Sequence, residues 1–171
     1  MRNGHTDHPL LVVINPEGVL YCLPKPSNVR FGDFVLDGAS CFIRRGAYEL
    51  IEELQFNPKY RLAFWSSATK SDRLGTVLQK FHVNTGNVAA ILGKDDLSRG
   101  RVKEIEGLAK KLEHPLERTV ALDIRLDRYP SGFGNIIEVP EYTTEKEPLD
   151  ILDDVSNRLS RSASKDLEIS P

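Results

Sequence analysis

The chain has little cysteine, no long hydrophobic run and no marked excess of charge of either sign, and each of these absences excludes a class of protein. Its 171 residues include two cysteines, Cys22 and Cys41, too few for a disulfide scaffold and typical of reduced thiols in a cytosol-like compartment. No segment approaches the roughly 20 apolar residues of a membrane span. The formal net charge of −2 favours neither nucleic acid nor an anionic membrane surface. We therefore expect no direct nucleic-acid binding and no membrane insertion.

The N-terminal arm, residues 1–9, is polar and lacks the apolar core of a secretory signal. It carries one Asp and one Arg, which is a poor match to a mitochondrial presequence. These features predict an intracellular soluble protein, or the mature part of a processed one. They do not distinguish a mitochondrial from a nuclear or cytoplasmic location.

Short apolar runs alternate with amphipathic stretches along most of the chain. The runs predict strands over residues 10–14, 60–65, 88–92, 119–122 and 135–139. Apolar spacing predicts helices over 47–54, 71–81 and 101–112 and from about 147 to 159, with Ser71 as a helix cap and a hairpin around 31–35. This alternation predicts an α/β, Rossmann-like fold with a mainly parallel sheet covered on both faces. One domain over 10–159 and a disordered tail over 160–171 complete the prediction.

Polar residues follow the predicted strands where those strands end. Asn15 and Glu17 follow the first strand, Ser66 and Ser67 follow the second, and Asp123 closes the fourth. In open α/β sheets, ligands bind at the carboxyl ends of the strands. We therefore expect Asn15, Ser66 and Asp123 to lie together at one edge of the sheet.

The order of these residues resembles the HAD-type phosphatase superfamily, in particular the branch related to RNA polymerase II C-terminal-domain phosphatases. That branch has D-x-D-x-T after its first strand, then an Arg-Gly segment, a W-T-S-A-like strand end, V-K-D-L and a terminal D-D. The counterparts here are Asn15-Pro16-Glu17-Gly18-Val19, Arg44-Arg45-Gly46, Trp65-Ser66-Ser67-Ala68, Val102-Lys103-Glu104-Ile105 and Leu122-Asp123-Ile124. The resemblance covers residues 10–159 and implies a HAD fold.

The resemblance also implies a chemistry that this chain has lost. In the family the first Asp attacks phosphorus, the second is the general acid and base, and Mg²⁺ offsets the negative charge. Here Asn15 has no anionic oxygen with which to attack, Glu17 is one methylene too long, and Ile124 replaces one of the paired carboxylates. The degenerate motif predicts no competent catalytic residue and no cofactor. The same departures are similar to those of the mitochondrial presequence-translocase receptor branch.

Ser66, Ser67 and Lys103 remain as candidates for a phosphate-binding remnant, and Asp123 as a weak metal-binding remnant. Each has an ordinary alternative: a helix cap for the serines, a solvated helix lysine for Lys103, with Lys94 as a rival, and a turn residue paired to Arg125 or Lys103 for Asp123. Glu17 has the alternative of a simple loop carboxylate.

Three functions are compatible with these residues. The first is an inactive HAD-type domain that binds protein partners in a larger complex, with Phe31 and Phe34 as the anchors unless they pack in the core of the domain. The second is a Mg²⁺-dependent protein phosphatase with divergent motifs. The third is a phosphopeptide-binding module that does not hydrolyse.

Overall fold

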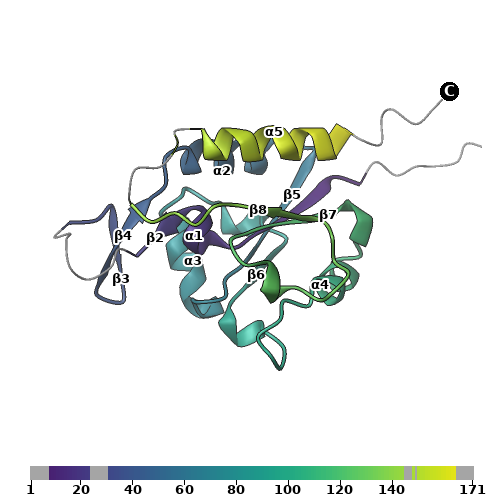
Figure 1. Cartoon of the computed structure of the whole chain (residues 1–171), viewed down its shortest axis with the longest axis horizontal. Coiled ribbons are helices and arrows are strands. Elements are labelled where there is room, and N and C mark those ends of the chain that lie inside the picture. The colour runs from purple at the N-terminus through teal and green to yellow at the C-terminus, as the bar shows by residue number, and fades with distance from the viewer. Residues whose placement is uncertain (1–7, 24–30, 145–147, 149, 165–171) are drawn as a thin grey trace, which may run out of the picture.

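A parallel five-stranded sheet forms the centre of the molecule (Figure 1). The structure is a computed structural model that describes residues 8–23, 31–144, 148 and 150–164. The strand order is β6-β5-β1-β7-β8, with bounds β1 Leu10–Ile14, β5 Tyr60–Trp65, β6 Ala90–Leu92, β7 Thr119–Asp123 and β8 Ile136–Glu138. Val12 of the central strand pairs with Leu62 on one side and Val120 on the other. The predicted α/β fold class is confirmed.

Helices cover both faces of this sheet unequally. One face packs against α2 (Ala47–Phe56), α3 (Ser71–Gln79) and α5 (Ile151–Ser164), which together enclose the larger core. The other face packs mainly against α4 (Ile105–Lys111), through Ile105 and Leu108. Since β1 is buried on both faces, every residue of its sequence is apolar, as expected for a central parallel strand. Helix α5 lies along α2 (Figure 1), where the Ser156 hydroxyl donates a hydrogen bond to Glu53.

A small antiparallel sheet stands beside the main one. Its order is β2 (Tyr21–Cys22), β4 (Ala39–Ile43) and β3 (Phe34–Leu36). The hairpin was expected around 31–35, but its turn is Asp37-Gly38, where both residues have positive φ, 49° and 82°. Two positive φ values in a two-residue loop are typical of a type I′ turn, for which Asp-Gly is a favoured sequence.

Short turns connect the remaining elements. Helix α1 (Pro16–Val19) is a single turn directly after β1, and 3₁₀ turns cover Thr85–Asn87, Lys94–Asp96, Leu116–Arg118 and Leu126–Arg128. None of the helices within the described ranges is long and apolar enough to cross a membrane.

Three expectations about helices are corrected. Helix α4 begins at Ile105 instead of residue 101, so Lys103 precedes it. Helix α5 ends at Ser164, beyond the predicted end of the domain at 159, because Leu159 is buried and Ala163 packs on the core. Ser71 does not cap α3; its backbone N–H and hydroxyl both donate to the Asp95 carboxylate, at 2.9 and 2.8 Å. Residues 1–7 and 165–171, the ends of the predicted arm and tail, lie outside the described residues.

Candidate functional site

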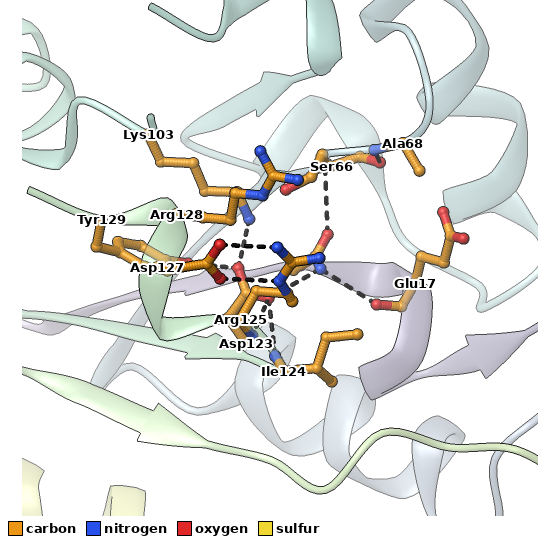
Figure 2. Close-up of polar contacts among 12 residues, drawn as sticks. Glu17, Ser66, Ala68, Lys103, Asp123, Ile124, Arg125, Asp127, Arg128 and Tyr129 are labelled. Carbon is orange, nitrogen blue, oxygen red and sulfur yellow. Dashed lines mark hydrogen bonds and ion pairs between the residues drawn. The ribbon is translucent and has the colours of Figure 1, made fainter. Parts of the chain in front are cut away.

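The polar residues predicted to converge do so at the carboxyl edge of the sheet (Figure 2). Asn15 follows β1 and Asp123 ends β7, and because these strands are parallel neighbours their ends meet. The Asn15 amide Nδ2 donates to Asp123 Oδ1 at 3.0 Å, and the Ser67 backbone N–H donates to Asn15 Oδ1 at 3.4 Å. Asn15, Ser66 and Asp123 are all buried. The site is therefore a closed polar cluster beneath the surface.

Asp123 is the centre of this cluster, and both of its carboxylate oxygens are occupied. Oδ1 accepts from Asn15 and from the backbone N–H groups of Ile124 (2.7 Å) and Arg125 (3.2 Å). Oδ2 accepts from the Lys103 ammonium at 2.6 Å and the Tyr129 hydroxyl at 2.8 Å. A carboxylate offers about four lone-pair sites, so these donors leave it no free acceptor capacity.

Lys103 supplies the positive charge that balances Asp123. Its side chain has no exposed surface, and its ammonium also lies 5.5 Å from the centre of the Tyr129 ring. The backbone N–H of Lys103 donates to the Arg128 carbonyl at 2.7 Å, which fixes the residue just before α4. Lys103 is thus a buried partner of Asp123 and not a solvated lysine, whereas Lys94 is exposed.

Burial dominates the protonation behaviour of the two donors on Oδ2. Burial lowers the pKa of Lys103 from its ordinary value, while the facing Asp123 carboxylate opposes that shift. Burial, assisted by Asp123, raises the pKa of Tyr129 well above its ordinary value. Tyr129 therefore keeps the proton that it donates to Asp123.

The orientation of the Asn15 amide follows from its neighbours. With Nδ2 toward Asp123, the amide also donates to the Glu17 carbonyl at 3.2 Å and its oxygen accepts from Ser67. The opposite orientation would place the amide oxygen against a carboxylate oxygen and an N–H group against an N–H group. Only the first orientation gives a hydrogen bond to all three partners, the Asp123 carboxylate, the Glu17 carbonyl and the Ser67 N–H group.

The Glu17 side chain points away from Asp123 (Figure 2). Burial raises the pKa of its carboxyl, and Glu141 raises it further. The next residue, Gly18, has φ +82°, and a Cβ there would lie 2.5 Å from Ile124 Cδ1. Ile124 thus packs against Gly18, and any larger residue at position 18 would force the Ile124 side chain to move. Gly18 of the degenerate first motif and Ile124 of the last therefore lie against each other.

The serines differ from each other in their partners. Ser66 Oγ accepts from the backbone N–H groups of Ala68 (3.2 Å) and Thr69 (2.8 Å). It caps the turn before α3, which begins only at Ser71. Ser67 Oγ is buried with no hydrogen-bond partner in the described part of the chain. Of the two serine hydroxyls that were candidates for binding phosphate, only that of Ser67 has no hydrogen-bond partner among the described residues.

Two residues of the site were not identified as functional candidates from the sequence. Tyr129 donates to Asp123 from the loop after β7, and its spacing gives no signal of that contact. Buried Arg44, noted only as part of the Arg-Gly motif, donates to the Gly18 carbonyl at 3.3 Å, to Val19 at 3.1 Å and to Pro140 at 2.7 Å. It ties the loop after β1 to the segment after β8.

The donor set does not fit the Mg²⁺ that the resemblance implies. Mg²⁺ takes oxygen ligands in octahedral geometry, but Asn15 presents its NH₂ group to Asp123, and Ile124 has no ligating atom. Lys103 already holds the carboxylate that a cation would need. No group of three or more His, Cys, Asp and Glu suited to a metal ion occurs among the residues that the structure describes.

The two phenylalanines considered as partner anchors separate in the structure. Phe31 is 86% exposed, whereas Phe34 is 8% exposed and its ring lies 5.4 Å from that of Tyr21 and 6.2 Å from that of Phe81. The surface prediction for Phe34 is wrong, because alternation along β3 turns its side chain into the core.

The solved structures that resemble this chain include two of an RNA polymerase II CTD phosphatase. A fission yeast RNA polymerase II CTD phosphatase Fcp1 variant bound to beryllium fluoride has 15% identity and a TM-score of 0.53, covering 94% of this chain and 54% of that chain. A second Fcp1 structure has 15% identity and a TM-score of 0.54, covering 93% and 50%. An uncharacterized protein from Listeria monocytogenes serotype 4b has 14% identity and a TM-score of 0.51, covering 88% and 98%.

These likenesses show that the chain shares the Rossmann-like α/β fold of the Fcp1 structures. The chain spans about half the length of the two Fcp1 structures. Neither a family model nor a curated protein matches the chain.

Proposed function

We propose that this chain is a catalytically inactive HAD-type domain that acts as a protein-binding or scaffold subunit of a larger complex. The observation that carries the proposal is the state of Asp123, whose two oxygens accept five hydrogen bonds and whose charge is balanced by Lys103. An ammonium and an amide N–H take the place that a divalent cation and its ligands would need.

The absence of a nucleophile at position 15 supports the same conclusion. A carboxamide cannot form an acyl phosphate, and loss of a nucleophile costs on the order of 10⁶ in turnover in other covalent enzymes. Glu17 is the nearest remaining carboxylate in the motif, but its side chain is directed away from Asp123 and Lys103 (Figure 2). A phosphatase that used Glu17 would need the whole loop after β1 to rearrange.

Apolar side chains exposed in and beside the small sheet support the binding role. Phe31 is 86% exposed, Val35 65% and Leu23 39%. Large apolar side chains that become buried on association supply most of the affinity of protein interfaces. Arg73 and Asp37 form an ion pair at 2.6 Å at the tip of the same sheet, a polar contact typical of an interface rim.

The test is an affinity purification from cell extract with the wild-type chain and with Phe31→Ser. Phe56→Ser is the matched control, because Phe56 is also an exposed phenylalanine (72%) but lies on α2. We expect a partner that is retained by wild type and by Phe56→Ser, lost with Phe31→Ser, and unaffected when the extract is first treated with phosphatase. A partner lost on that treatment would instead favour the phosphopeptide-binding alternative. Equal capture by all three proteins would contradict the role of this surface.

A further inference from the structure

An apolar groove of about 370 Å³ lies between the edge of the main sheet and helix α4, far along the sheet from β8. Its walls are Trp65, Ala89–Leu92 and the side of α4 that carries Gly107, Leu108 and Leu112. A volume of this order matches the lower range of ligand sites in proteins, about 300–1,000 Å³. The groove belongs to the face of the sheet that packs mainly against α4.

Gly107 is the residue that keeps this groove open. It is the third residue of α4 and has no positive φ, and the nearest atom that a Cβ there would meet is Glu104 Cβ, at 3.8 Å. The fold of this chain therefore does not require a glycine here, although glycine inside a helix is less favourable than alanine. A glycine at position 107 would be required if a group from outside the domain lay close against this side of α4.

Strand β6 borders the groove and ends the sheet. β5 pairs with one side of β6, and no other strand of the described residues pairs with its outer side. An unpaired strand edge is a template for an added strand. The edge of β6 offers backbone hydrogen bonds, and the groove beside it offers a concave apolar surface for side chains.

The charges around the groove are ordered from one end to the other. Asp96 and Glu104 lie where β6 ends and α4 begins. Lys111 lies at the other end of α4, where the Arg61 guanidinium near the start of β5 donates to the Leu112 carbonyl at 3.0 Å. A bound segment would meet carboxylates at one end and an ammonium at the other.

We propose that this groove binds an extended peptide segment of a partner protein, which adds to β6 as an antiparallel strand. Antiparallel pairing is the more stable arrangement per residue. It places the N-terminal end of the peptide beside Asp96 and Glu104, and its C-terminal end beside Lys111. The recognised segment therefore has a basic residue, alternating apolar residues and then an acidic residue. A second copy of this chain fits less well, because two identical concave grooves cannot fill each other.

The proposal depends on the β6 edge and not on the loss of catalysis or on the Phe31 surface. Its test is a titration of the ¹⁵N-labelled full chain with a capped heptapeptide, Arg-Thr-Val-Thr-Leu-Thr-Glu, followed by amide chemical shifts. The same peptide with Arg and Glu exchanged tests the charge order. Gly107→Leu tests the groove, and Gly75→Leu is the matched control, a mid-helix glycine of α3 that does not line the groove.

We expect saturable shifts at Ala90–Leu92 and Gly107 with the first peptide. The charge-exchanged peptide should bind about tenfold more weakly, because it loses the rim ion pairs at both ends of the groove. Gly107→Leu should abolish binding while its melting temperature rises by about 2–4 °C, as in Gly75→Leu, which should bind like wild type.

Three results would overturn the proposal. One is the absence of saturable shifts in the wild-type chain. The second is equal binding by Gly107→Leu. The third is a wild-type dimer by light scattering that Gly107→Leu converts to a monomer, since the groove would then be occupied by a second copy.

Discussion

Replacing Asn15 by Asp restores the residue type of a nucleophile and, in this site, should destabilise the fold. The substitution places a second carboxylate where an amide N–H now donates to Asp123 Oδ1 at 3.0 Å. Among the residues that the structure describes, the Lys103 ammonium is the one side-chain cation bonded to Asp123, and it is already paired at 2.6 Å. The repulsion between two charges at that separation is about 5 kcal/mol at an effective dielectric constant near 20.

The new carboxyl can avoid this repulsion by binding a proton. Holding an acid of pKa about 3.9 protonated costs about 4 kcal/mol at pH 7 and about 1.5 kcal/mol at pH 5. A carboxyl whose pKa is higher in the folded state stabilises that state at low pH and loses this contribution as pH rises. We therefore expect Asn15→Asp to lose about 4 kcal/mol of unfolding free energy at pH 7 and to recover most of it by pH 5.

Urea denaturation at pH 5 and pH 7, with and without MgCl₂, measures this effect. Asn87→Asp, in an exposed turn, is the matched control and should change the free energy little at either pH. An Asn15→Asp variant as stable as wild type at pH 7, or one that MgCl₂ restores to wild-type stability, would refute the reasoning. The second result would mean that a carboxylate at position 15 completes a metal site.

Further substitutions test other parts of the account. Lys103→Met leaves Asp123 buried without a cation and should cost about 3–5 kcal/mol in urea denaturation; a loss below about 1 kcal/mol, the level of an exposed ion pair, would contradict the buried pair. Burial raises the pKa of Glu17, so Glu17→Gln should be more stable than wild type at neutral pH, and melting curves should converge as pH falls toward 4; a constant difference would be inconsistent with that shift. Phe34→Ser should lower the melting temperature by roughly 10 °C, since it removes a core ring, whereas Phe31→Ser should leave it unchanged; equal effects would refute the assignment of one to the core and one to the surface.

The sequence predicted the sheet well because central strands carry an unambiguous signal. Residues 10–14 and 60–65 are strands with the predicted bounds. The first is buried and apolar throughout, as a strand covered on both faces must be, and the second is apolar except for half-buried Arg61 near its start. The helix boundaries were less accurate. Nothing in the apolar pattern places the start of α4 after Lys103, because that start is set by a tertiary bond from the Lys103 backbone to Arg128.

The convergence of Asn15 with Asp123 was predictable, but the closure of the site was not. Strand ends in a parallel sheet meet at one edge whatever their side chains do. The five donors on Asp123 come from three segments of the chain, and the role of Tyr129 depends on the path of the loop after β7. The Asp37-Gly38 turn is a different case, because its Asp-Gly signal was present in the sequence and was not used.

Turnover of p-nitrophenyl phosphate by the purified wild-type chain in MgCl₂ tests the central claim most directly, with Glu17→Gln as the control for contaminating phosphatase. The account predicts no Mg²⁺-dependent rate that differs between the two proteins, because Asn15 cannot attack and Asp123 is held by Lys103. A wild-type kcat above about 1 s⁻¹, in the range of ordinary enzymes, that falls in Glu17→Gln would contradict it and would make the chain a phosphatase with a rearranged nucleophile.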